Sequence, residues 1–137
     1  MKQVVTVRNV TIGEGMPKIC VPIIAATEEE IIRKAEEIMK YPADLIEWRV
    51  DYFEEAYNLE AVASALTEIR RVIGDMPLLF TFRSEQEGGC KAIGAKDYFA
   101  LNLAVAMYGE VDLIDIEIYQ DFERAKNVIS MLHEAGI

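Results

Sequence analysis

The sequence predicts an α/β fold, namely the (β/α)4 half of a TIM (β/α)8 barrel preceded by an N-terminal β-hairpin. Four β-type segments alternate with four amphipathic helical segments, a pattern typical of parallel strands joined by crossover helices. The predicted strands begin near residues 19, 45, 78 and 113. No linker or low-complexity tract interrupts the order. We therefore expect a single partial domain over residues 1–137.

The hairpin is expected over residues 1–15, where two short β-type runs join near Asn9 and end in a turn containing Gly13 and Gly15. Residues 16–137 are expected to form the four β–α units, and Thr27 is the predicted N-cap of their first helix. The predicted strands are residues 18–24, 43–50, 77–83 and 111–118, and the predicted helices are residues 26–41, 58–74, 95–109 and 121–136.

The strand patterns separate a half barrel from the alternative, a small doubly wound sheet. Central strands of a doubly wound sheet are covered on both faces and are continuously apolar. Here the second to fourth strands alternate, which predicts one helix-covered face and one polar inner face, as in a barrel. The polar set is Glu47, Arg49, Asp51, Thr81, Arg83, Asp115 and Glu117, and the apolar set is Ile46, Trp48, Val50, Leu78, Phe80, Phe82, Ile114, Ile116 and Ile118.

The charged residues gather toward the C-terminal ends of these strands, where barrel enzymes place their chemistry. Arg49 and Arg83 favour a ligand with a carboxylate or phosphate, because the guanidinium fork matches both groups. A self-satisfied ion-pair network that holds the strands in register is the alternative. Glu87 precedes two glycines in "SEQEGG" and is either an acid–base residue on a mobile loop or an ordinary solvated acid. From the residues alone, the ligand is a small polar anion.

Composition and motifs exclude several other classes of function. The 14 Lys and Arg against 24 Asp and Glu give a net charge of −10, which predicts no nucleic-acid partner. With no long apolar run, we expect a cytoplasmic protein without a membrane segment. Cys20 and Cys90 are expected to be buried or idle thiols, and His133 a helix-surface residue. "GEGMPK" does not match a dinucleotide loop, and we expect neither a metal site nor a cofactor.

Four segments together, "GEGMPKICVPI", "DLIEWRVD", "PLLFTFRSEQEGG" and "VDLIDIEI", resemble type I 3-dehydroquinate dehydratase. This family is a lyase of the shikimate pathway of aromatic amino-acid biosynthesis, and it converts 3-dehydroquinate to 3-dehydroshikimate through a lysine Schiff base. The resemblance covers nearly the whole chain. It implies a (β/α)8 barrel, a hairpin that closes its bottom, and a dimer.

Carried over by motif, the resemblance implies that Glu47, Arg49 and Arg83 bind the substrate. It implies that Glu87 orients the catalytic histidine. A whole barrel needs about 250 residues, and the family's catalytic histidine and Schiff-base lysine belong to the fifth and sixth strands. We therefore expect the N-terminal half of the enzyme, inactive by itself. Pro22 stands where some members have a serine, so no role is carried over there.

The half barrel also predicts how the chain associates, and it leaves an alternative function open. Its first and last strands have open edges, and such edges pair with partners. We expect a homodimer through these edges. The alternative function is a non-catalytic half-barrel, either a self-associating scaffold or an anion-binding module.

Overall fold

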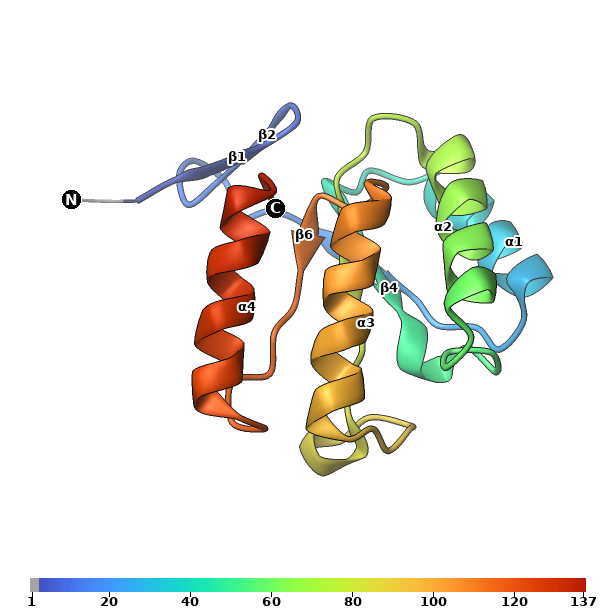
Figure 1. Cartoon of the computed structure of the whole chain (residues 1–137). Coiled ribbons are helices and arrows are strands. Elements are labelled where there is room, and N and C mark those ends of the chain that lie inside the picture. The colour runs from blue at the N-terminus through green and yellow to red at the C-terminus, as the bar shows by residue number, and fades with distance from the viewer. Residues whose placement is uncertain (1–2) are drawn as a thin grey trace.

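The structure is a computed structural model that describes residues 3–137, so residues 1 and 2 of the predicted 1–15 hairpin lie outside the described residues. It consists of a small antiparallel hairpin and a four-stranded parallel sheet in the order β3-β4-β5-β6. Helices α1 to α4 follow the four strands in turn (Figure 1). This is the predicted (β/α)4 arrangement with its hairpin.

The strands are shorter than predicted but lie at the predicted positions. In the hairpin, Val7 pairs with Val10 across the tight turn. In the parallel sheet, Pro22 is level with Glu47, and Glu47 with Leu79. The strands are β1 Val5–Val7, β2 Val10–Ile12, β3 Cys20–Ile23, β4 Leu45–Arg49, β5 Leu78–Thr81 and β6 Leu113–Ile114.

Local capping chemistry fixes where the helices begin. Thr27 accepts a hydrogen bond from the backbone N–H of Glu30, as predicted for an N-cap. Asn58 and Asp121 cap α2 and α4 in the same way. Short 3-10 turns, η1 (Val50–Tyr52) and η2 (Glu85–Glu87), follow β4 and β5. The helices are α1 Glu28–Ile38, α2 Leu59–Ile73, α3 Ala95–Tyr108 and α4 Phe122–Glu134.

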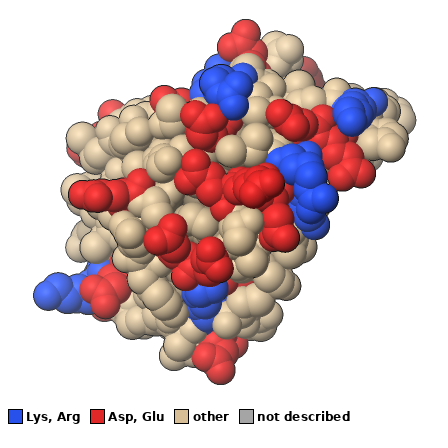
Figure 2. Space-filling model, turned by 90° about the vertical axis from the view of Figure 1, so that its right-hand side faces the viewer, with Lys and Arg blue, Asp and Glu red and all other residues tan. Residues whose placement is uncertain are grey.

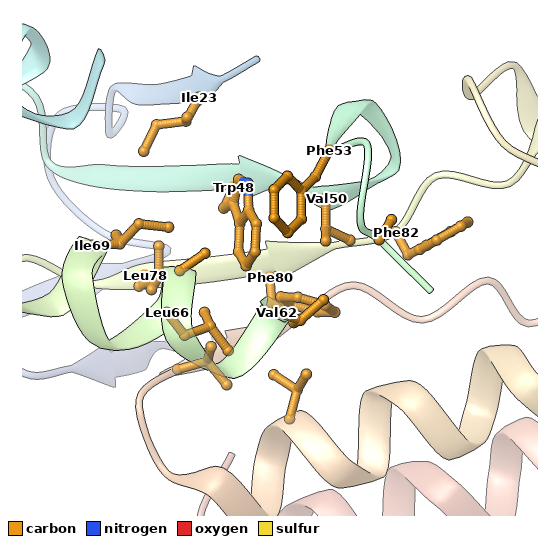
Figure 3. Packing of buried hydrophobic residues seen from close by; sticks show 14 of the residues in the cluster. Ile23, Trp48, Val50, Phe53, Val62, Leu66, Ile69, Leu78, Phe80 and Phe82 are labelled. Atoms are coloured by element: carbon orange, nitrogen blue, oxygen red, sulfur yellow. The ribbon is translucent and has the colours of Figure 1, made fainter. Parts of the chain in front are cut away.

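The core lies between the sheet and the helices (Figure 3). Trp48 is fully buried, with its ring centroid 5.8 Å from those of both Phe53 and Phe80. The predicted helix-covered face is confirmed for β4 and β5, whose apolar residues are buried. It is wrong for Ile118, which is exposed.

The doubly wound alternative is wrong. The strands lie side by side in chain order, and α1 contacts α2, α2 contacts α3 and α3 contacts α4. A doubly wound sheet reverses its strand order and covers both faces with helices. Here the helices form one layer, so the other face of the sheet, which we call the inner face, carries Glu47 and Arg49.

The predicted strand over residues 111–118 is the largest error in the element boundaries, because β6 contains only Leu113 and Ile114. The N–H of Asp115 still donates to the main-chain oxygen of Phe80 at 3.0 Å, and beyond this bond the pairing with β5 ends. The hydroxyl of Tyr98 on α3 donates to the main-chain oxygen of Asp115 and accepts from the N–H of Glu117. These two hydrogen bonds replace the partners that a strand ladder would have supplied.

Ion pairs attach the hairpin to the end of the sheet where the strands begin. Arg8, at the hairpin turn, reaches Asp112 at 2.8 Å and Asp75 at 3.1 Å. Asp112 also accepts hydrogen bonds from the guanidinium of Arg70 and from the backbone N–H of Leu78, the first residue of β5. Both donors lie at this same N-terminal end of the sheet. The hairpin thus covers the N-terminal ends of the strands, which leaves their C-terminal ends open for a site.

The outer helical surface is acidic. Figure 2 shows carboxylates gathered over the side of the molecule formed by α1 and α2. The first turn of α1 carries Glu28, Glu29 and Glu30, which complement the helix dipole. Within residues 3–137, no helix combines the length and the apolarity needed to cross a bilayer.

Candidate active site

The four residues predicted to form the site come from two neighbouring strands and the loop after the second. Glu47 and Arg49 lie on the inner face of β4, and Trp48 between them points to the opposite face and is buried. Arg83 lies two residues beyond the end of β5, and Glu87 ends the 3-10 turn η2. All four therefore lie at or near the C-terminal ends of parallel strands, as predicted from the sequence.

Arg49 is held by a bidentate ion pair. Its Nε and Nη2 atoms donate to the two carboxylate oxygens of Asp51, each at 2.9 Å. The guanidinium carbon also lies 5.0 Å from the ring centroid of Tyr52. The hydrogen bond to Asp51 raises the pKa of Arg49 above its ordinary value. Nη1 has no hydrogen-bond partner in the described chain and is the free donor of this guanidinium.

Arg83 is surrounded by three carboxylates. Its Nη1 lies 3.2 Å from both Glu87 and Glu117, and its Nη2 lies 3.0 Å from Asp115. Partial burial works to lower the pKa of Arg83, but the charges of the carboxylates outweigh it, and the pKa is raised. The side chain of Glu117 is fully buried, whereas those of Asp115 and Glu87 are each 33% exposed. Arg83 is therefore bounded by one buried acid and two partly exposed acids.

Glu117 is buried but well supplied with donors. Besides Arg83, it accepts from the backbone N–H of Ser84 at 2.8 Å and from the side-chain amide of Gln120 at 2.6 Å. Burial raises the pKa of the neighbouring Tyr98 hydroxyl, which keeps it protonated as the donor to Asp115. The end of β6 is thus fastened both to the loop after β5 and to α3.

Glu47 is the carboxylate of the site with no basic partner among residues 3–137. One of its oxygens accepts from the hydroxyl of Thr81 at 2.8 Å, across the β4–β5 ladder. Its remaining acceptor sites suit hydroxyl or other donor groups of a ligand. Together with the free Nη1 of Arg49, Glu47 offers an acceptor and a donor on the same face of β4.

The loop after β5 keeps a closed shape through its own backbone. The N–H of Gly89 donates to the main-chain oxygen of Ser84 at 2.8 Å, and the N–H of Glu85 donates to that of Lys91 at 2.9 Å. A Cβ atom on Gly89 would overlap the carbonyl group of Arg83. Gly88 adopts φ of 90°, which favours glycine. The two glycines let the loop bring Glu87 back to Arg83.

The structure differs from the sequence interpretation at Asp51 and at the two cysteines and agrees with it at His133. Asp51 does not continue the extended strand but lies in η1, fully buried. Cys20 and Cys90, expected to be buried or idle thiols, are free and exposed, so the expectation is wrong as to burial. His133 is exposed on α4, as predicted, and lines a hollow with hairpin residue Arg8, at the end of the sheet away from the site.

Two residues of the network were not assigned a role from the sequence. For Asp51 the sequence offers an indication, since it follows Arg49 by two positions in "EWRVD" and could pair with it. For Lys91 it offers none, because Nζ reaches the main-chain oxygen of Asp51 only once the loop has closed. One surface hollow, of about 530 Å³, lies away from these residues and is lined by residues of α2 and α3 such as Leu59 and Leu101. Another, of about 620 Å³, is lined by residues of the loop after β5, among them Ser84 and Gln86.

The arrangement agrees with known proteins. Residues 19–137 match the family described as Type I 3-dehydroquinase. The chain is 48% identical over 137 residues to a 3-dehydroquinate dehydratase of Clostridioides difficile and 43% identical to one of Clostridium botulinum, and it covers 54% of each. It thus spans about half the length of these curated relatives.

Solved structures give the same result. The crystal structure of a type I 3-dehydroquinate dehydratase from Clostridium difficile, with covalently modified comenic acid, superposes with a TM-score of 0.97 at 47% identity. This chain is covered completely, and 54% of that one. The 3-dehydroquinate dehydratase of Enterococcus faecalis gives a TM-score of 0.92 at 41% identity, covering 97% and 55% of the two chains. The chain therefore belongs to the type I 3-dehydroquinase family, and it corresponds to the N-terminal half of its members.

Proposed function

We propose that this chain provides the substrate-binding part of a 3-dehydroquinate dehydratase, which removes water from 3-dehydroquinate to give 3-dehydroshikimate. One observation carries the proposal: Glu47 and Arg49 present an acceptor and a free donor together on the inner face, beside Arg83. A polyhydroxylated ring acid has the matching groups, since its hydroxyls donate to a carboxylate and its carboxylate accepts from guanidinium.

Each residue then has a role that its contacts support. Glu47 accepts from a ring hydroxyl while Thr81 holds its other oxygen in place. Arg49 donates through Nη1. Arg83 binds the substrate once Glu87, its partly exposed partner, moves aside. Glu87, released in this way, is free to orient a catalytic histidine.

The covalent step needs groups that these four residues do not provide. The family resemblance implies a lysine that forms a Schiff base with the ketone and a histidine that moves the adjacent proton. In the described chain no lysine ends one of the strands β3 to β6, and Lys91 is already bonded to Asp51. We infer that the chain alone binds substrate without turning it over.

Calorimetric titration with 3-dehydroquinate tests the proposal. We expect heat of binding at millimolar ligand or below, and its loss in Arg83→Ala, because that variant removes the guanidinium held at the strand end. Borohydride added to the complex should leave the mass of the chain unchanged. Arg71→Ala is the matched control, since among residues 3–137 Arg71 pairs only with Glu68, on the surface of α2, and it should bind as the unaltered chain does.

Either of two results would contradict this function. A stable borohydride adduct on a lysine would show that the chain carries its own Schiff-base group. Absence of binding heat at millimolar ligand would favour the second candidate, a non-catalytic scaffold. One observation favours that candidate: carboxylates of the chain already occupy both arginines, as in a self-satisfied network.

We also propose that two copies associate through the edges of the sheet. In the described chain β3 and β6 each have one hydrogen-bonded neighbour, and the inner face is uncovered by helices. Unpaired edges and an open sheet face favour association.

Free thiols at Cys20 and Cys90 suit a reducing compartment, and we place the protein in the cytoplasm.

Light scattering should give a mass near twice the 15.5 kDa of one chain. Cys20→Lys puts a charge on the inner face of the edge strand β3 and should shift the mass toward the monomer. Cys90→Lys, at an exposed thiol in the loop, is the matched control and should remain dimeric. A monomer in the unaltered chain at all concentrations would contradict association through the edges.

A further inference from the structure

Asp51 receives more hydrogen bonds than a buried acid needs for an ion pair alone. Its side chain is fully buried. Oδ1 accepts from Nε of Arg49 at 2.9 Å and from the backbone N–H of Arg83 at 3.2 Å. Oδ2 accepts from Nη2 of Arg49 at 2.9 Å and from the backbone N–H of Cys90 at 3.1 Å. Each oxygen thus joins one guanidinium N–H to one backbone N–H.

These donors come from three separate parts of the site. Arg49 ends β4, Arg83 follows β5, and Cys90 lies at the far end of the loop that carries Glu87. The main-chain oxygen of Asp51 adds a fourth tie, from Nζ of Lys91 at 2.9 Å. The turn η1 makes this possible, because it brings the side chain of Asp51 back toward the strand that it has just left.

We propose that Asp51 is a positioning residue of this site. Its carboxylate fixes the Arg49 guanidinium with Nη1 left free, and it holds both ends of the loop that carries Glu87. The part of this proposal that concerns ligand rests on the proposed function. The coupling of Arg49 to the loop stands on the contacts alone.

The electrostatics agree with a carboxylate kept ionised for this purpose. Burial works to raise the pKa of Asp51, but hydrogen bonds from Arg49 and from the amides of Cys90 and Arg83 outweigh it and hold the pKa below its ordinary value. A depressed pKa in the folded state means that its stabilisation is present above the unfolded value, near pH 4, and is lost as pH falls further. The charged groups facing Asp51 are Arg49 and Lys91.

Asp51→Asn tests the coupling, with Asp112→Asn as the matched control. Asp112 also pairs with arginines, Arg8 and Arg70, and accepts a backbone N–H, that of Leu78, but at the other end of the sheet. Two NMR readouts are used: the Nε–H resonance of Arg49, and hydrogen exchange of the Arg83 and Cys90 amides. In Asp51→Asn we expect the resonance to move and both amides to exchange about tenfold faster, as for loss of a charge-assisted hydrogen bond.

The control should leave the Arg49 resonance and the loop amides unchanged and should speed exchange at Leu78. Equal changes in both variants would show that Asp51 contributes only to the overall stability of the fold, and this would overturn the proposal. Unchanged exchange of the loop amides in Asp51→Asn would overturn it as well. If Asp51→Asn does not fold, an acid titration of the unaltered chain, followed by NMR, tests the same coupling between Asp51, Arg49 and the loop. The Arg49 resonance and both loop amides should then shift together with the Asp51 carboxyl, and independent shifts would overturn the proposal.

A calorimetric titration with 3-dehydroquinate then tests the ligand part. Asp51→Asn should weaken binding at least about tenfold, since Arg49 and the loop both lose their anchor, while Asp112→Asn should bind unchanged. Unchanged affinity in Asp51→Asn would contradict the part of the proposal in which Asp51 positions groups for ligand binding. Absence of binding in the unaltered chain would instead contradict the proposed function, while the NMR readouts would still decide the coupling.

Discussion

Replacing Gly89 by alanine should destabilise the chain by about 3 kcal/mol, at the upper end of the usual cost of overpacking. The added Cβ would overlap the carbonyl carbon and oxygen of Arg83, which are backbone atoms and cannot rotate away. The loop would have to open. That movement breaks the hydrogen bond from Gly89 to Ser84 and pulls the Cys90 amide away from Asp51.

Urea unfolding followed by the fluorescence of Trp48, the single tryptophan, measures this change. Gly88→Ala is the matched control, because a Cβ there meets no atom within 4 Å and only the φ of 90° is unfavourable. It should cost about 1–2 kcal/mol, the price of a left-handed residue. Equal effects at the two glycines would show that close approach to Arg83 does not decide the loop's shape.

Replacing Glu117 by alanine should destabilise the chain by about 3 kcal/mol, the lower range for breaking a buried ion pair. The substitution removes the acceptor of the buried Ser84 N–H and one of the carboxylates bound to Arg83. It also leaves the amide of Gln120 without its partner. We place the cost at the lower range because the guanidinium of Arg83 is 27% exposed and water can replace part of the loss.

Asp115→Ala supplies the comparison for Glu117. Both acids contact the same guanidinium, at 3.0 and 3.2 Å, but the side chain of Asp115 is 33% exposed and that of Glu117 is fully buried. Partly exposed pairs contribute little, so Asp115→Ala should cost about 1 kcal/mol or less. Thermal or urea unfolding measures both variants. A larger loss at Asp115 would show that its contact to Arg83, rather than the buried anchor, holds the end of β6.

The two variants also separate stability from binding at this site. Glu117 lies behind Arg83, away from solvent, whereas Glu87 and Asp115 lie on the open side. The buried acid fixes where the guanidinium lies. Under the proposed function a ligand takes the place of the exposed acids, so that the self-satisfied network and the ligand site would be two states of the same residues.

Local patterns in the sequence were sufficient for the order of the elements. The alternation in "LIEWRV" and "LLFTFR" separated the apolar face, with Trp48 and Phe80, from the inner face, with Glu47 and Arg83. Residues two apart in a strand share a face whatever surrounds them. For the same reason the position of the site at the strand ends followed from the sequence. The roles of Glu47, Arg49, Arg83 and Glu87 came from the family resemblance and stay predictions.

Contacts between distant residues could not be predicted in this way. The strand over residues 111–118 was expected from the same alternation, yet it ends at Ile114 because Tyr98, on a different element, takes the hydrogen bonds of Asp115 and Glu117. The pattern of Ile114 and Ile116 gives no sign of this competition. A strand at the edge of a sheet has few ladder bonds to resist it.

The sequence by itself determined the alternation of strands and helices, the helix-covered face and the family, because each rests on residues near one another in the chain. Only the tertiary structure decided which acid binds which arginine. Arg83 meets Glu117 across 34 residues, and Asp51 meets Cys90 across 39. Such pairings depend on how loops close and on which donors compete for one buried carboxylate, and neither is encoded in a local pattern.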